Sequence, residues 1–235
     1  MESKKWFEED FNKFFKGSQD SNSRFLTVDK YPCYQDKTST TEFDSHYIYH
    51  PAWATRVVKE ISPQFHIDIG STLHFSSILS AFFTTKFYDY RPANLLLDNL
   101  ESGSADLTQL FFNTNEVESL SCMHTVEHVG LGRYGDPIDP EGDIKAMKEL
   151  QRVVKPGGSL LFVTPVGKPK IAFNAHRIYS YKMIIENFNQ MEVVEFSMIP
   201  DNAMEVGMIR NCPIDLVARQ EYACGCFWLK KKNNV

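Results

Sequence analysis

The sequence predicts an α/β protein built around a mostly parallel β-sheet. Short apolar runs that fit buried strands alternate with segments whose apolar residues have helical spacing. Several of these runs end in glycine, an acidic residue or histidine. Alternating strands and helices are typical of βαβ units, whose strands are parallel. Ligands bind beyond the carboxyl ends of such strands, so the residues that follow each run form the candidate site.

The composition favours one domain with a sizeable core. The chain has 235 residues, of which 43% are hydrophobic and 13% aromatic. Its net charge of -5 argues against nonspecific binding to nucleic acid. No apolar run approaches the roughly 20 residues of a membrane span, and the first residues lack the apolar stretch of a signal peptide. Because the five cysteines show no framework spacing, we expect a cytoplasmic protein with reduced thiols.

Two helices are expected before the sheet, in residues 6–15 and 52–61, where apolar residues recur at helical spacing. The polar stretch 17–23 is interpreted as a loop. We therefore divide the chain into an N-terminal helical or lid extension, residues 1–50, and a main domain, residues 51–235.

The main domain is expected to contain seven strands. They are residues 65–70, 86–90, a short run between 95 and 106, 117–123, 159–164, 193–198 and 222–229. The expected helices among them are residues 76–85, 143–154 and 179–188. Gly157-Gly158 is expected to end the second helix before the strand that follows it. The long connection 200–221 is interpreted as an insertion over the site or a dimer contact. Lys230-Lys231-Lys232 is expected to be a solvated tail.

The first two strand ends carry the main signal for a ligand. Asp68-Ile69-Gly70-Ser71 has a glycine where the backbone must turn tightly beside a ligand. A dinucleotide fingerprint has three glycines, so the single one here argues against NAD and FAD. Asp89 follows Gly70 by 19 positions, close to the roughly 20 expected of an acid that binds ribose hydroxyls. The alternative for Asp89 is a surface turn.

Two further stretches have more than one interpretation. Asp106 is equally suited to accept a hydrogen bond from an adenine amino group or to cap a helix. The run from His124 to His128 fits the His-x-x-Glu-His pattern of inverted zinc peptidases, which need both histidines on one helical face. Here the run ends a predicted strand and Gly130-Leu131-Gly132 follows, so we interpret it as a loop near a substrate and expect no metal.

These stretches together resemble class I S-adenosylmethionine-dependent methyltransferases over residues 65–164. The most specific match is the helix and turn from Leu150 to Gly158, before the fifth expected strand. The resemblance implies a Rossmann-like three-layer sandwich whose last strand is antiparallel, with S-adenosylmethionine as the cofactor. The cofactor-binding residues that it implies are Asp68, Gly70, Ser71, Asp89, Tyr90, Arg91, Asp106, Leu107 and His124.

The resemblance also implies where catalysis takes place. Glu127-His128 is similar to the Glu-His of small-molecule methyltransferases. A hydroxyl acceptor needs a base, and His128 is the first candidate and His176 the second, with Glu127 orienting one of them. The candidates for contact with the acceptor are Arg133, Tyr134, Asp136 and Arg177, and the two arginines suit an anionic group.

A narrower resemblance concerns the acceptor. Residues 46–50, 130–137 and 174–177 are similar to a domain-of-unknown-function branch of the class, one associated with sugar or surface-glycan biosynthesis. It implies a sugar or glycan-precursor hydroxyl as acceptor, no nucleic-acid partner and a possible homodimer. The first motif departs from the usual Gly-x-Gly, which favours the alternative of a noncatalytic cofactor-binding or scaffold protein.

Overall fold

The computed structural model describes residues 2–20 and 27–233, which form two compact units that divide between Phe43 and Asp44. In the first unit, α1 (Glu2–Asp20) includes the predicted helix 6–15. The predicted loop 17–23 is helical as far as Asp20, and its last three residues lie outside the described residues. No helix in the described residues combines the length and apolarity needed to cross a membrane.

The second unit opens with α2 (Ser45–Ile61), which begins earlier than the sequence predicted. Asp44 caps it by accepting a hydrogen bond from the Tyr47 backbone N–H at 3.2 Å. Residue 50, where we expected the extension to end, therefore lies within α2. The consequence for the site is that His46 and His50 lie one helical turn apart on an ordered element.

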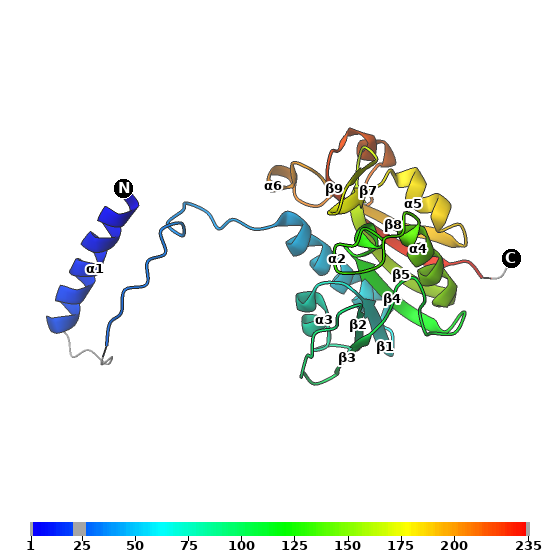
Figure 1. Cartoon of the computed structure of the whole chain (residues 1–235), viewed down its shortest axis with the longest axis horizontal. Helices are drawn as coiled ribbons and strands as arrows, with labels where there is room; N and C mark the ends of the chain where they lie inside the picture. The colour runs from blue at the N-terminus through cyan, green and yellow to red at the C-terminus, as the bar shows by residue number, and fades with distance from the viewer. Residues whose placement is uncertain (1, 21–26, 234–235) are drawn as a thin grey trace. The chain divides into compact units, whose positions relative to one another are not determined.

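Seven strands form one sheet in the order β3-β2-β1-β4-β5-β9-β8 (Figure 1). Their bounds are β1 (Phe65–Ile69), β2 (Thr84–Asp89), β3 (Leu100–Ser104), β4 (Val117–Met123), β5 (Val154–Val166), β8 (Met191–Ile199) and β9 (Ala223–Lys231). Every pairing from β3 to β5 is parallel, whereas β9 runs antiparallel to both β5 and β8. The predicted mostly parallel sheet with an antiparallel last strand is confirmed.

Helices cover both faces of this sheet, as the predicted three-layer sandwich requires. The side chains of β5 alternate, with Leu160 and Phe162 in one buried cluster and Leu161 and Val163 in the other. α4 (Gly142–Val153) and α5 (Tyr181–Asn187) complete the first cluster. α2 and α3 (Leu73–Leu79) complete the second.

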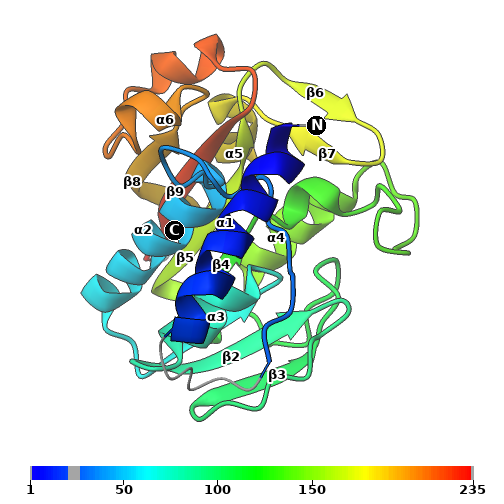
Figure 2. The same cartoon turned by 90° about the vertical axis from the view of Figure 1, so that its left-hand side faces the viewer.

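Several short elements extend beyond the carboxyl ends of the parallel strands. They are η1 (Val126–His128), β6 (Lys170–Ala172), β7 (His176–Ile178), α6 (Ala203–Val206) and η2 (Ile214–Arg219). β6 and β7 form a hairpin, which lies at the same end of the sheet as α6 in both views (Figures 1 and 2). The predicted connection 200–221 thus contains α6 and η2, and its Ile209 pairs with Met198 of β8.

Further local predictions were wrong. Gly157-Gly158 does not end the helix before its strand, because α4 ends at Val153 and β5 begins at Val154 and includes both glycines. The expected helix 76–85 begins and ends earlier, as α3, because Thr72 caps it and the β-branched residues Thr84 and Thr85 pair with β1. The expected solvated lysine tail instead continues β9 as far as Lys231. The ammonium of Lys231 is buried and donates to the carbonyl of Gln151 at 2.7 Å, at the negative end of the α4 dipole.

Candidate functional site

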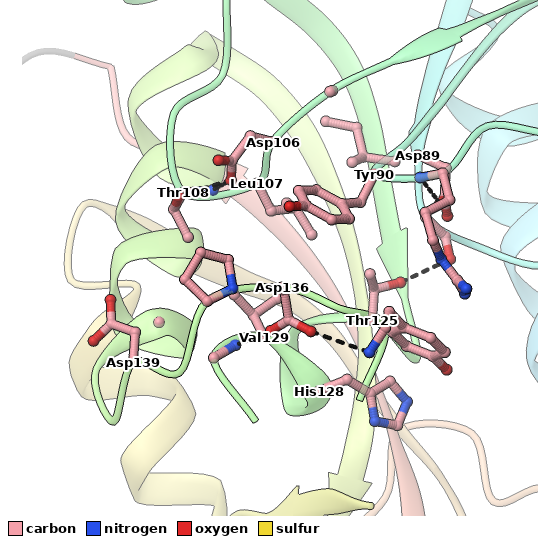
Figure 3. A pocket seen from close by; sticks show the side chains of 18 of the residues that line it. Asp89, Tyr90, Asp106, Leu107, Thr108, Thr125, His128, Val129, Asp136 and Asp139 are labelled. Atoms are coloured by element: carbon pink, nitrogen blue, oxygen red, sulfur yellow. Dashed lines mark hydrogen bonds between the residues drawn. The ribbon is translucent and has the colours of Figure 1, made fainter. Parts of the chain in front are cut away.

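A cavity of about 270 Å³ lies at the carboxyl end of the sheet (Figure 3). Residues that follow four parallel strands line it: Gly70 after β1, Asp89 at the end of β2, Asp106 after β3, and His124 and His128 after β4. Tyr90, Arg91 and Leu107 line it as well. The structure therefore brings together most of the residues that the sequence suggested for a cofactor.

Gly70 closes β1 in a conformation that suits glycine. Its φ is +72°, and a Cβ added there would lie 2.5 Å from Cγ2 of Thr125. The Thr125 hydroxyl also donates to the Gly70 carbonyl at 2.8 Å. The loops after β1 and β4 consequently meet without space for a side chain at residue 70, and both loops border the cavity.

Asp89 and Asp106 supply carboxylates to the cavity from neighbouring strands. Oδ1 of Asp89 accepts a hydrogen bond from the Arg91 backbone N–H at 2.7 Å. Oδ1 of Asp106 accepts from the backbone N–H and the hydroxyl of Thr108, at 2.8 and 2.7 Å. No helix begins at Asp106 in the described structure, so the capping alternative does not apply. A tight local turn orients each carboxylate through its Oδ1. None of these hydrogen bonds involves Oδ2.

The loop after β4 orients two histidines differently. His124 is buried, has a φ of +54°, and its Nδ1 lies 2.9 Å from Oε1 of Glu127. Nδ1 of His128 lies 2.6 Å from the carbonyl oxygen of Ala175. A carbonyl only accepts, so Nδ1 of His128 carries the hydrogen and its Nε2 keeps a lone pair. Figure 3 shows His128 across the cavity from Asp89 and Asp106.

Asp68 and Ser71 do not line the cavity but support the strand ends around it. Asp68 is fully buried and accepts hydrogen bonds from the hydroxyls of Ser76 and Ser121. Burial raises the pKa of Asp68 to about 6, although these hydrogen bonds oppose the shift. The Ser71 hydroxyl accepts from the Met123 backbone N–H at 3.1 Å, which ties β1 to the end of β4.

The residues proposed for the acceptor divide into two groups. Tyr134 and Asp136 line the cavity. Asp136 also closes its own loop, because Oδ2 accepts from the Gly130 backbone N–H at 2.8 Å. Arg133 lies outside the lining and donates to the Ala175 carbonyl at 3.1 Å. Arg177 is buried and donates to the Val129 carbonyl at 2.6 Å, so its guanidinium holds the loop after β4.

The mouth of the cavity combines positive charge with an aromatic ring. The guanidinium of Arg91 lies 4.5 Å from the ring centroid of Tyr134, and that of Arg133 lies 5.2 Å from it. Tyr134 in turn meets His128 edge to face at 5.6 Å. An anionic acceptor group at this mouth would lie close to two guanidinium groups.

Sequence reasoning singled out the aromatic residues at 46–50 but did not connect them with His124, behind which they cluster. His46 and Tyr47 of α2 stack on His124 with centroid distances of 5.5 and 5.3 Å, and His50 meets it edge on at 5.0 Å. His176, the second candidate base, lies outside the cavity lining and contacts Tyr222 at 4.8 Å. The only sequence signal was the spacing of His46 and His50, four residues apart as on one helical face.

Burial keeps His46, Tyr47 and His50 uncharged near neutral pH. Desolvation, with a smaller contribution from His124, lowers the pKa of His46 to about 4. Desolvation also lowers the pKa of His50 well below its usual value. Burial raises the pKa of Tyr47 to about 12, and Glu127 adds to that rise. The two imidazoles of α2 are therefore neutral at pH 7 and carry lone pairs.

Comparisons with known proteins define the class of fold. A family model described as "Caenorhabditis protein of unknown function, DUF268" matches residues 104–210. A search of curated proteins found no match. A putative sarcosine dimethylglycine methyltransferase from Galdieria sulphuraria superposes with a TM-score of 0.54 at 11% identity, covering 79% of this chain and 86% of that one.

Two further solved structures have the same fold. One is the Burkholderia thailandensis 1,6-didemethyltoxoflavin-N1-methyltransferase with bound S-adenosylhomocysteine, with a TM-score of 0.53, 8% identity and 79% of each chain covered. The other is the [4+2]-cyclase SpnF, with a TM-score of 0.51, 12% identity, and 77% of this chain and 81% of that one covered. The chain thus has the Rossmann-like fold of class I S-adenosylmethionine-dependent methyltransferases.

Proposed function

We propose that the protein is an S-adenosylmethionine-dependent methyltransferase that acts on a small-molecule acceptor, with a sugar or glycan-precursor hydroxyl as the leading acceptor class. The observation that carries the proposal is the convergence of Gly70, Asp89 and Asp106 on one cavity at the ends of β1, β2 and β3. A carboxylate at the tip of the second strand suits vicinal ribose hydroxyls, and the next one along suits an adenine amino group.

The cavity residues have distinct roles in this proposal. S-adenosylmethionine supplies a methyl group on a sulfonium, which an acceptor oxygen attacks in line as the carbon–sulfur bond breaks. Nε2 of His128 accepts the proton that the acceptor hydroxyl loses, because its Nδ1–H is already donated to Ala175. Arg91 and Arg133 hold an anionic part of the acceptor at the mouth.

The competing proposal is a protein that binds the cofactor, or keeps the fold, without methyl transfer. Its support is the single glycine of the first motif and the similar fold of SpnF, which is named as a cyclase. Binding and turnover separate the two proposals. Isothermal titration of the full chain with S-adenosylhomocysteine should give saturable binding, and NAD should give none.

Turnover is then measured as S-adenosylhomocysteine released from S-adenosylmethionine in the presence of sugars, sugar phosphates and nucleotide sugars. Release that depends on one of these acceptors supports methyl transfer. Binding without release for any acceptor favours the noncatalytic alternative. Absence of binding at millimolar S-adenosylhomocysteine would refute both cofactor-dependent proposals.

A further inference from the structure

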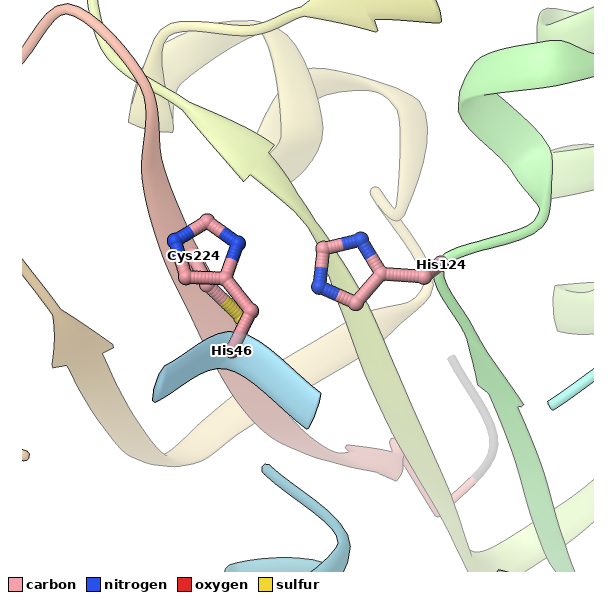
Figure 4. A group of neighbouring side chains, drawn as sticks. All are labelled: His46, His124 and Cys224. Atoms are coloured by element: carbon pink, nitrogen blue, oxygen red, sulfur yellow. The ribbon is translucent and has the colours of Figure 1, made fainter. Parts of the chain in front are cut away.

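Three side chains of types that commonly bind metals converge beside the cavity from three separate elements. His46 comes from the first turn of α2, His124 follows β4, and Cys224 lies on β9. Their ligand atoms all lie within 4.8 Å of one another. Figure 4 shows the imidazole of His124 pointing toward His46 and Cys224.

Hydrogen bonding presents one nitrogen of His124 as a ligand. Its Nδ1 lies 2.9 Å from the carboxylate of Glu127, which accepts when ionised, so Nδ1 carries the hydrogen. Nε2 of His124 therefore has a lone pair, and it is buried without a hydrogen-bond partner. A carboxylate that orients an imidazole in this way is the usual outer partner of a metal-binding histidine.

The surroundings of His124 give independent support for a missing partner. The side chain is only 4% exposed, so bulk solvent has little access to the free nitrogen. Nε2 of His50 is a second buried imidazole nitrogen without a partner, and its ring meets that of His124 at 5.0 Å. The left-handed backbone of His124, with φ +54°, is uncommon outside glycine and recurs at ligand sites.

We propose that His46, His124 and Cys224 bind a divalent transition-metal ion of the zinc class. Two imidazoles and one thiolate favour Zn²⁺ or Co²⁺ over Mg²⁺ and Ca²⁺, which prefer oxygen ligands. On binding, the Cys224 thiol loses its proton to solvent and the resulting thiolate forms the sulfur–metal bond. Three protein ligands leave the fourth tetrahedral position open, as in catalytic zinc sites.

The present spacing is compatible with such an ion after a small contraction. Metal–nitrogen bonds of about 2.0–2.1 Å and a metal–sulfur bond of about 2.3 Å place tetrahedral ligand atoms roughly 3.5 Å apart. The separations of up to 4.8 Å would therefore shorten by about 1.3 Å at most. His46 provides that adjustment most readily, because it lies in the first turn of its helix.

This site differs from the zinc-peptidase pattern of the sequence. His124 belongs to the site, but His128 does not, because the ligand atoms that lie within 4.8 Å of one another come from His46, His124 and Cys224. The metal site stands independently of methyl transfer. Because His124 also lines the cavity, water or an acceptor oxygen from that cavity is the expected fourth ligand.

The test uses the full chain, stripped of metal with a chelator and titrated with Co²⁺ and then Zn²⁺ in the absence of any cofactor. We expect one ion per chain by elemental analysis, a thiolate-to-cobalt charge-transfer band, and displacement of Co²⁺ by Zn²⁺ but not by Mg²⁺. Cys224→Ser should abolish the band, and His46→Gln and His124→Gln should each weaken affinity by at least about tenfold.

Cys226→Ala is the matched control, because Cys226 is equally buried on the same strand, with its sulfur 3.8 Å from that of Cys224. It should keep the stoichiometry and the band. Circular dichroism checks the fold of each variant. If Cys224→Ser does not fold, the loss of metal affinity in His46→Gln tests the proposal. Absence of stoichiometric binding, or a band that survives Cys224→Ser, would overturn the proposal. Binding of S-adenosylhomocysteine is measured separately, so the two proposals fail independently.

Discussion

Asp89 offers the sharpest residue-scale test of the cofactor site. One of its oxygens is engaged by the Arg91 backbone, and the carboxylate lines the cavity at the end of β2. Asp89→Ala removes a charged hydrogen-bond acceptor, so affinity for S-adenosylhomocysteine should fall by about 1–3 kcal/mol in a calorimetric titration. The control Asp98→Ala removes an exposed carboxylate outside the cavity lining and should leave affinity unchanged. Equal affinities for the two variants would refute the assignment.

His128 tests the chemistry rather than the binding. His128→Ala removes the proposed base, so turnover with an accepted hydroxyl substrate should fall by about 10²–10⁴-fold. Binding of S-adenosylhomocysteine should persist. His74→Ala changes an exposed histidine outside the lining and should leave turnover as in the parent protein. An active His128→Ala variant would remove this residue as the base.

Gly70 tests why the first motif needs glycine at that position. Gly70→Ala places a Cβ in a left-handed conformation and 2.5 Å from Thr125, so the free energy of unfolding should fall by about 2–3 kcal/mol. Gly135→Ala is matched, because φ is +84° and no atom lies within 4 Å of its added Cβ. The control should therefore lose only about 1 kcal/mol in denaturant unfolding. Similar losses in both variants would show that the contact with Thr125 is unimportant.

At the scale of elements, α2 is anchored to the sheet by a buried polar contact. Nε1 of Trp53 donates to Oε1 of Glu195 on β8 at 2.8 Å, and Arg210 pairs with Oε2 of the same carboxylate. Trp53→Phe should lower the free energy of unfolding by about 2 kcal/mol, because it removes a hydrogen bond to a charged group and some packing. Lys59→Ala, on the exposed side of α2, is the control for chemical unfolding.

A double-mutant cycle with Glu195→Leu, which has no hydrogen-bond acceptor, separates the hydrogen bond from the packing contribution. Coupling between residues 53 and 195 of about 0.5 kcal/mol or more is expected for groups in direct contact. Additive losses would mean that Trp53 acts through packing alone. The same anchor fixes α2, and so it also holds His46 beside His124.

The elements that the sequence predicted well are those whose pattern is local. β4 was predicted at its observed bounds, 117–123, and Gly70, Asp89 and Asp106 follow their strands as expected. The strand ends could be predicted because periodicity and turn residues locate them without tertiary information. The predicted helix 76–85 was wrong at its end. Its last residues belong to β2 instead, because they pair with β1, and the sequence pattern does not reveal this pairing.

Residues that come together only through the fold could not be predicted in the same way. His46, His124 and Cys224 are far apart in the sequence, and no motif spacing connects the three. The sequence suggested that Lys231 belongs to a charged tail. Antiparallel pairing with β8 and β5 instead extends β9 as far as Lys231, whose ammonium is buried at the end of α4. Sequence periodicity contains no information about such pairings.

At the scale of the whole molecule, both faces of the sheet are covered and the site lies at one end. Homodimerisation, including a role for residues 200–221, stays a prediction. Sedimentation of the full chain at several concentrations measures it directly. A second whole-molecule property is the dependence of stability on pH, because the centre of the sheet buries a histidine and an aspartate in one hydrogen-bonded chain.

The buried chain joins His66 to Asp68 through Ser121. Nε2 of His66 lies 2.9 Å from the Ser121 hydroxyl, which donates to Oδ1 of Asp68 at 2.5 Å. Burial lowers the pKa of His66 from 6.5 to about 3. Burial also raises the pKa of Asp68 from 3.8 to about 6. The two shifts have opposite effects on stability below neutral pH.

The signs follow from which state binds the proton. Between pH 6.5 and about 3, the unfolded chain protonates His66 and the folded chain does not, so stability is lost as pH falls. Between pH 6 and 3.8, the folded chain protonates Asp68 while the unfolded chain does not, so this group stabilises the fold as pH falls. The larger shift of His66 makes net loss the expected result for these two groups.

His66→Gln isolates the histidine contribution, because glutamine does not titrate and can still hydrogen-bond to Ser121. Relative to the parent protein, the variant should gain up to about 1.4 kcal/mol of stability for each pH unit below 6.5. Denaturant unfolding at pH 7, 5.5 and 4.5 measures this difference. His74→Gln, at an exposed position, should follow the parent at all three values. A difference between His66→Gln and the parent that stays constant with pH would show that His66 protonates equally in the folded and unfolded chains.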